Sequence, residues 1–119
     1  MLRQLRSINL SCNEIRILPD LSCLVSLRKL NLSCNKLTSL IKLKTLAEGC
    51  GLLEFVELSG NRLTNLKEIR IFENFKNLKS LYFHQDAENT NPMCLPEDLY
   101  YSECLVLMAK VTLLKIDGR

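Results

Sequence analysis

The chain has 119 residues, the size of one small domain, and 47% of them are hydrophobic, enough to bury a modest core. Its formal net charge of +3 is too small to indicate nucleic-acid binding by itself. The sequence shows no apolar leader and no apolar run of transmembrane length, so we expect neither secretion nor a membrane span. The charge is uneven: residues 1–44 hold eight basic and two acidic side chains, and residues 45–119 hold eight basic and eleven acidic ones.

A pattern of apolar residues recurs along the chain, and its clearest copy runs from Leu27 to Leu40 as LRKLNLSCNKLTSL. In each copy the L-x-x-L-x-L segment is expected to form a short strand whose second and third leucines point inward. Successive strands then pair in parallel through crossovers. The apolar positions are Leu5, Ile8 and Leu10; Leu27, Leu30 and Leu32; Leu53, Val56 and Leu58; Leu78, Leu81 and Phe83; and, in a shortened last copy, Leu113 and Ile116. The period predicts an α/β solenoid of the leucine-rich repeat type, with a concave parallel β-sheet of about five strands and helical or 3-10 crossovers on the convex side.

An asparagine follows the strand in three copies, and its amide can satisfy backbone groups of its own turn and of the neighbouring turn. An aliphatic residue would leave those groups unpaired, at about 1–3 kcal/mol each. In the fourth copy this position falls on Asp86 and in the last on Asp117. The predicted structural asparagines are Asn13, Asn35 and Asn61.

The crossovers differ in length. Leucines step by three over residues 18–27, as in a tight turn, whereas residues 40–53 leave room for about one α-helical turn that Gly49 and Gly51 end. Aliphatic and aromatic residues over 66–78 are expected in the core, and residues 85–98 form a polar loop. We expect one domain, residues 1–119, with repeats over 1–84 and a loop and C-terminal cap over 85–119.

The N-terminal edge of the predicted sheet lacks a cap, since the chain begins inside the tail of an earlier unit. Such an edge calls for missing residues, a partner or a self-contact, with Leu2 and Leu5 buried there against another copy or an upstream repeat. We expect a fragment of a longer protein, in which Met1 need not be native. One hypothesis is therefore a structural scaffold that self-assembles through this edge.

The whole chain resembles the short-repeat intracellular class of leucine-rich repeat proteins with units of the form LxxLxLxxNxIxxIxxLxxL. Its members include the regulatory subunit of protein phosphatase-1, the spliceosomal A-prime protein, the axonemal dynein light chain and centrosomal repeat proteins. The tail is similar to the C-terminal cap of that class, although Val111 replaces its usual proline before the last strand. The cap residues are Asn91 and Pro92, Tyr100 or Tyr101, a helical run from Leu105 to Ala109, and Leu113, Ile116 and Asp117.

Within that class, the run from Asp86 to Cys94 looks most like centrosomal and basal-body proteins that join such a domain to a coiled coil. This resemblance implies an intracellular, cytoplasmic protein of the centrosome, basal body or cilium. It implies a protein partner, and by analogy with the other members also allows phosphatase-regulatory or spliceosomal protein binding.

The sequence argues against an enzyme and against a cofactor or metal. The only histidine, His84, has no serine or cysteine at a catalytic spacing, and no glycine-rich phosphate loop is present. The spacing of His84, Cys94 and Cys104 fits no zinc site. We expect all six cysteines to be reduced and Cys12 and Cys34 to be small buried side chains that recur with the repeat.

Binding is expected on the outward-facing residues of the strands. Phe55 and Tyr82, with His84 beside them, predict an aromatic patch on a hydrophilic face, and such residues often anchor protein interfaces. The predicted partner-binding residues are Lys29, Asn31, Phe55, Glu57, Tyr82 and His84, with Arg6 and Arg28 joining Lys29 in a basic border for an acidic segment. RNA binding is unlikely on this sequence, because no aromatic stacking platform is interleaved with basic residues.

Overall fold

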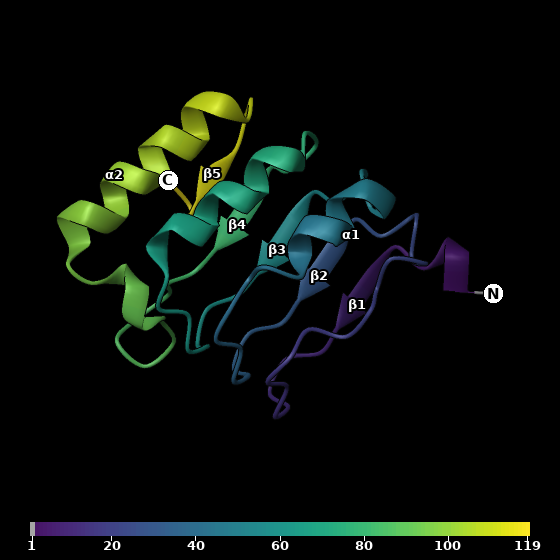
Figure 1. Ribbon diagram of the computed structural model, residues 1–119, viewed down its shortest axis with the longest axis horizontal. Helices are drawn as coiled ribbons and strands as arrows, with labels where there is room; N and C mark the ends of the chain where they lie inside the picture. Colours follow the sequence, from purple (N-terminus) through teal and green to yellow (C-terminus); the bar gives the residue numbers. More distant parts are fainter. Residues whose placement is uncertain (1) are drawn as a thin grey trace.

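The computed structural model describes residues 2–119, and of Leu2 only the backbone. The strands are β1 (Ser7–Asn9), β2 (Lys29–Asn31), β3 (Phe55–Glu57), β4 (Ser80–Tyr82) and β5 (Lys115–Ile116). They form one parallel sheet in the order β1-β2-β3-β4-β5, as Figure 1 shows. The helices are α1 (Leu43–Gly49) and α2 (Glu97–Lys110), and the 3-10 helices are η1 (Leu2–Gln4), η2 (Leu66–Asn74) and η3 (Pro92–Cys94). The predicted five-stranded solenoid is confirmed.

The strands are only three residues long or shorter because one inward side chain per strand is enough to line the core. The central residues Leu30, Val56 and Leu81 are completely buried between the sheet and the crossovers. A parallel sheet needs one crossover per strand, and α1, η2 and α2 supply the later ones on the opposite side of the core (Figure 1).

The first crossover contains only turns, in which Leu24 and Leu27 bond back to residues three positions earlier. The longer second crossover forms α1, as its length predicts, with Leu43 and Leu46 buried. The third is the nine-residue 3-10 helix η2. The convex side therefore thickens from the thin first crossover toward α2.

Asparagine ladders join the turns that follow the strands. Asn61 is 6% exposed, and its Nδ2 donates to the carbonyl oxygens of Leu32 at 2.9 Å and Leu58 at 3.0 Å. Its Oδ1 accepts from the N–H of Leu37 at 3.0 Å. Asn35 makes the equivalent bonds one repeat earlier, so these two predicted structural asparagines each tie two repeats together.

The ladder position in the fourth repeat belongs to Asn91, so its assignment to Asp86 is wrong. Asn91 is 1% exposed, its Nδ2 donates to Leu58 and Phe83 carbonyls, both at 2.9 Å, and its Oδ1 accepts from the N–H of Leu63. Asp86 instead shapes an inserted surface turn. The extra residues of this turn displace the asparagine along the chain without displacing it in space.

The C-terminal cap departs from the prediction at three places. The polar loop is shorter than residues 85–98, because η3 and the first turn of α2 lie within that range, and α2 extends well beyond residues 105–109. Of the two tyrosines that the prediction leaves open, Tyr100 is the buried one. Leu113 is 78% exposed in a left-handed conformation, and Leu114 takes its expected place in the core.

A left-handed residue recurs just before the ladder asparagine in the first three repeats. Cys12, Cys34 and Gly60 have φ angles of 57°, 56° and 74° at this position. Cys12 is exposed and Cys34 half-buried, so the prediction that both are buried is wrong. The turn places the side chain at the surface, and a Cβ on Gly60 would lie 3.2 Å from the backbone nitrogen of Cys34.

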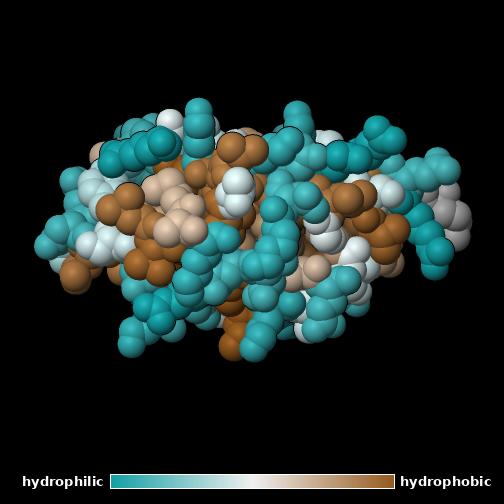
Figure 2. Space-filling view, turned by 90° about the horizontal axis from the view of Figure 1, so that it is seen from above, coloured by the Kyte–Doolittle hydropathy of each residue, from teal (hydrophilic) through white to brown (hydrophobic). Residues whose placement is uncertain are grey.

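Exposed apolar residues lie mainly away from the sheet. Figure 2 looks onto the molecule from above and shows several groups of hydrophobic residues between hydrophilic side chains, one of them toward the end at which α2 lies. On this helix Leu99 and Leu105 are 55% and 64% exposed. Leu99 and Leu105 therefore expose apolar surface that lies outside the sheet.

Candidate protein-binding face

The outward side chains of the strands form two rows on the concave face, by which we mean the sheet face opposite α1, η2 and α2. One row joins Ser7, Lys29, Phe55, Ser80 and Lys115, which are register partners across all five strands. The second joins Asn9, Asn31, Glu57 and Tyr82. The structure thus brings six of the predicted binding residues onto or next to one surface: Lys29, Asn31, Phe55, Glu57, Tyr82 and His84.

Phe55 and Tyr82 form the aromatic patch of this face. Their ring centroids lie 5.8 Å apart with the planes tilted by 49°, a separation at which aromatic rings attract each other. Both rings are half-buried, so each keeps part of its surface open to a partner. His84 follows two residues after Tyr82, and its Nδ1 lies 2.8 Å from the Thr90 hydroxyl, which orients the ring.

Two lysines flank the aromatic patch along the first row. Lys29 is the register partner of Phe55, and Lys115 is the register partner of Ser80 on the far side. Both are exposed, and within residues 2–119 neither takes part in an ion pair. The face therefore offers apolar surface between two free positive charges.

The basic border is weaker than the sequence predicts, because Arg28 is already paired. Its Nη1 lies 2.7 Å from Oε2 of Glu54, and the Nζ of Lys79 lies 3.7 Å from the other carboxylate oxygen. The hydrogen bond from Arg28, aided by the charge of Lys79, holds the pKa of Glu54 below its usual value. Arg6 and Lys29 remain exposed in this border.

Two predicted binding residues already form hydrogen bonds within the chain. Glu57 is 5% exposed, because Gln85 of the inserted turn donates to its Oε2, and its Oε1 accepts from the N–H and hydroxyl of Ser59 at 2.9 and 2.6 Å. The expectation that Glu57 is an open contact residue is therefore wrong. Asn31 is half-buried, and its Oδ1 accepts the same pair of bonds from Ser33.

The sequence carries a signal for this arrangement. A serine follows two residues after the outward polar residue in three successive repeats, at Ser11, Ser33 and Ser59, and in each case its N–H and hydroxyl donate to that residue. Asn31 and Glu57 therefore shape the turns that end their strands, a role that sequence reasoning missed.

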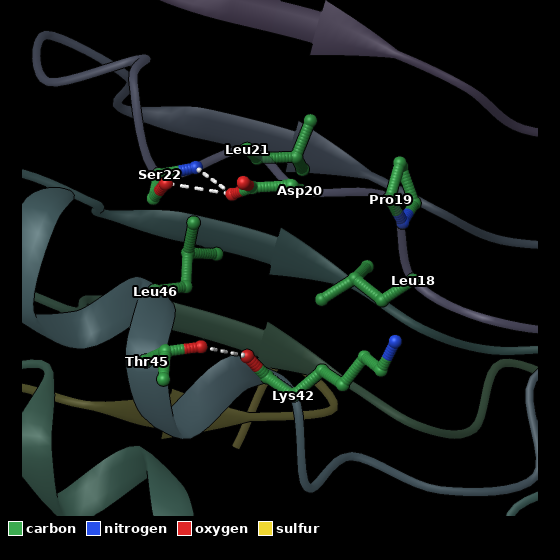
Figure 3. A pocket seen from close by; sticks show the side chains of 8 residues that line it. All are labelled: Leu18, Pro19, Asp20, Leu21, Ser22, Lys42, Thr45 and Leu46. Atoms are coloured by element: carbon green, nitrogen blue, oxygen red, sulfur yellow. Dashed lines mark hydrogen bonds between the residues drawn. The ribbon is translucent and has the colours of Figure 1, made fainter.

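A pocket of about 410 Å³ lies on the convex side, between the first crossover and α1 (Figure 3). The side-chain oxygens of its lining already take part in local hydrogen bonds. The Oδ1 of Asp20 accepts from the N–H and hydroxyl of Ser22, which lowers the pKa of Asp20, and the hydroxyl of Thr45 donates to the carbonyl of Lys42. The pocket results from the step between a thin crossover and a helix, and its lining forms no catalytic constellation.

Three of the six cysteines, Cys50, Cys94 and Cys104, are buried. Burial raises the pKa of the Cys50 and Cys94 thiols and raises that of Cys104 to about 12, which disfavours the reactive thiolate. Among residues 2–119 no three His, Cys, Asp or Glu side chains could together hold a metal ion. Over the same residues, no helix is both long and apolar enough to cross a membrane.

Comparisons with known proteins agree with this fold. A leucine-rich repeat family model matches residues 4–24 and 26–46. The chain is similar to a leucine-rich repeat protein of Leptospira interrogans, with 30% identity and a TM-score of 0.67 over 95% of this chain and 25% of that one. Its fold is also similar to that of an internalin from Listeria monocytogenes, with 22% identity and a TM-score of 0.57 over 72% of this chain and 24% of that one. The search of curated proteins found no match.

The fold is that of a leucine-rich repeat solenoid, and the first two repeats match the leucine-rich repeat family model. The chain spans about a quarter of the length of each of these two solved structures. Leucine-rich repeat domains generally mediate protein–protein interactions and are typically not enzymes. The narrower subfamily that the resemblance implies stays a prediction.

Proposed function

We propose that the chain is a protein-binding module whose concave face takes a segment of a partner protein. The observation that carries the proposal is the aromatic patch, where Phe55 and Tyr82 leave apolar surface open in the middle of an otherwise polar sheet. Aromatic side chains at the centre of an interface contribute most of the binding energy at such sites. An apolar side chain of the partner is expected to pack against the open surface of the two rings.

The charges around the patch indicate the chemistry of that segment. Lys29 and Lys115 are exposed and lie on opposite sides of the patch, and Arg6 extends the positive charge beyond Lys29. The nearest acidic groups of the face, Glu54 and Glu57, are engaged within the chain. The partner segment is therefore expected to carry acidic residues on both sides of its apolar anchor.

This proposal can be tested with peptides selected from a displayed random library against the wild-type chain. Replacing Phe55 and Tyr82 together by alanine is expected to weaken binding of the selected peptide by about 30-fold or more, since a single anchoring ring already contributes about 2 kcal/mol. Titration calorimetry measures this loss. The variant should stay folded at the temperature of the measurement, because both rings lie outside the fully buried core, and circular dichroism checks this.

A matched control removes exposed apolar side chains elsewhere. The Leu99→Ala, Leu105→Ala double variant changes α2 and leaves the concave face intact, so its affinity should stay within about twofold of the wild type. If the selected peptides bind the Phe55→Ala, Tyr82→Ala variant as well as the wild type, the concave face is not the binding surface. The centrosomal, basal-body or ciliary setting of this activity remains a prediction from the resemblance.

A further inference from the structure

Two cysteines occupy the same position in the adjacent turns that follow β1 and β2. Cys12 and Cys34 each come three residues after the end of their strand, and both are left-handed, with φ angles of 57° and 56°. The N–H of Cys12 donates to the carbonyl of Ser33, the residue before Cys34, at 2.9 Å. The two turns therefore lie directly against each other at the cysteines.

The asparagine ladder holds these turns in register. Asn13 and Asn35 directly follow the two cysteines, and Oδ1 of Asn35 accepts from the N–H groups of Asn13 and Ile15, both at 3.1 Å. The Nδ2 of Asn13 donates to the carbonyls of Leu10 and Ser11, so Asn13 supports its own turn as predicted. Hydrogen bonds thus fix the backbone on which both thiols are carried.

Side chains at this position closely approach the neighbouring repeat. Gly60 holds the same position one repeat later, and a Cβ placed on it would lie 3.3 Å from both the Sγ and the Cα of Cys34. Moved back by one repeat, this geometry directs the side chain of Cys34 toward Cys12. Adjacent strands lie about 4.8 Å apart, and the two Cα atoms of a disulfide are about 4.4–6.8 Å apart, so the spacing suits a disulfide.

The thiol of Cys34 is affected by that of Cys12. Burial is the main cause that raises the pKa of Cys34, and the thiol of Cys12 is the next cause. The raised pKa favours the protonated thiol, which donates to Oδ1 of Asn89 at 3.4 Å. The structure therefore describes the reduced form of the pair.

Both cysteines of the pair reach solvent. Cys12 is exposed, and Cys34 is half-buried although a repeat lies on each side of it. The exposure of Cys34 is set by these two repeats and not by the residues before β1, where the predicted burial of Leu2 lies outside the described side chains. Cys23 is also exposed but lies in the first crossover, and the remaining three cysteines are buried.

We propose that Cys12 and Cys34 are a redox-sensitive pair that forms a reversible disulfide between the first two repeats. The oxidant is a small-molecule disulfide, RSSR. One protein thiolate attacks it, forms a mixed disulfide and releases RS⁻. The second protein thiol then loses its proton, and its thiolate attacks the protein sulfur of the mixed disulfide and releases the second RS⁻. In total, two protein thiols lose two electrons and two protons, and RSSR becomes two RSH.

Oxidation in a glutathione buffer tests the pairing. The folded chain is incubated with mixtures of reduced and oxidised glutathione, the remaining thiols are blocked with N-ethylmaleimide, and tryptic peptides are identified by mass spectrometry. Trypsin separates Cys12, Cys23 and Cys34 into the peptides 7–16, 17–28 and 30–36. The link between peptides 7–16 and 30–36 is expected to be at least about tenfold more abundant than any other link, because the fold brings only these two thiols together at the surface.

The unfolded chain provides the sharpest comparison. Cys23 lies midway along the sequence between Cys12 and Cys34, and shorter loops close more readily in an unfolded chain. In concentrated urea, links to Cys23 should therefore exceed the link between Cys12 and Cys34, and folding should reverse this order. If the folded chain and the urea-treated chain give the same order of products, the proposal is overturned.

Serine variants separate the pair from the other thiols. In Cys12→Ser or Cys34→Ser, the remaining cysteine of the pair should hold glutathione as a stable mixed disulfide, because no neighbouring thiol displaces it. Cys23→Ser is the matched control, since it removes an exposed thiol outside the pair and should leave the link between peptides 7–16 and 30–36 unchanged. Accumulation of glutathione on both Cys12 and Cys34 of the wild-type chain, without a link between them, would show that the thiols do not meet.

The location of the link is checked in the same samples. The disulfide removes the proton that Cys34 donates to Asn89, so the side-chain amide signals of Asn89 in NMR spectra should shift on oxidation and return after reduction with dithiothreitol. A link carried only by covalent dimers, detected by non-reducing electrophoresis, would contradict a pair within one chain. The Phe55→Ala, Tyr82→Ala variant should form the disulfide normally, so failure of this proposal is distinguishable from failure of the concave binding face.

Discussion

Single asparagine amides hold neighbouring turns of the solenoid together. Each buried amide bonds to at least two carbonyls and one N–H, on two different repeats, in a place that the surrounding apolar side chains shield from water. Loss of such a side chain exposes no new apolar surface but leaves several buried backbone groups without partners. The position therefore requires a side chain that both donates and accepts hydrogen bonds.

Asn91 provides the test of this role, because the sequence pattern alone assigns it to Asp86. Replacing Asn91 by alanine should lower the free energy of unfolding by about 3 kcal/mol, since Leu63, Leu58 and Phe83 each lose a partner. Asp86→Ala removes only exposed bonds to Glu88 and Asn89 and should cost no more than about 1 kcal/mol. Urea denaturation measures both values, and equal losses would contradict the assignment.

Residue types at repeat positions could be predicted, and their solvent exposure could not. The period correctly places Phe55 and Tyr82 on the outward side of their strands. It places Glu57 there too, yet Gln85 covers that side chain. The covering contact comes from an insertion that the period does not describe, so only the folded structure reveals it.

At the scale of elements, α2 closes the C-terminal end of the core. Tyr100 is buried on this helix, packs edge-on against Phe83 and donates from its hydroxyl to Oδ2 of Asp117 at 2.6 Å. Burial is the main cause that raises the pKa of Tyr100, and the adjacent thiol of Cys104 adds to it, so the hydroxyl stays protonated and can donate. Asp117 in turn accepts from two N–H groups after β4, so one hydroxyl links the helix to the sheet.

Tyr100→Phe tests the strength of this link. It should lower the free energy of unfolding by about 1–3 kcal/mol, because the carboxylate of Asp117 loses a charge-assisted hydrogen bond in a partly buried place. Tyr101→Phe removes the neighbouring hydroxyl, which accepts only from the exposed Arg119, and should change stability by less than about 0.5 kcal/mol. Chemical denaturation of the two variants compares them, and an inert Tyr100→Phe change would show that this hydroxyl does not hold α2 to the sheet.

The elements differ in how well the sequence predicts them. The strands and α1 follow from apolar spacing, because each needs only a local pattern and a crossover of suitable length. The C-terminal cap does not, since its register depends on contacts between α2, η2 and β5 that are distant in the chain. The one-residue shift from Leu113 to Leu114 is a consequence of that docking.

At the scale of the whole molecule, the repeats gather positive charge around the aromatic patch of the concave face. Lys29 and Lys115 flank Phe55 and Tyr82, and within residues 2–119 neither lysine forms an ion pair. The face carries this charge although the chain as a whole has a net charge of only +3. The solenoid thus concentrates charge that composition alone conceals.

Mapping the contact surface tests the central proposal, that the concave face binds the partner. Backbone amide NMR shifts, recorded as a peptide selected against the wild-type chain is added, should be largest on β2, β3 and β4, around Lys29, Phe55 and Tyr82. They should disappear in the Phe55→Ala, Tyr82→Ala variant and persist in the Leu99→Ala, Leu105→Ala control. Shifts confined to α1, η2 and α2, with the concave strands unaffected, would contradict it.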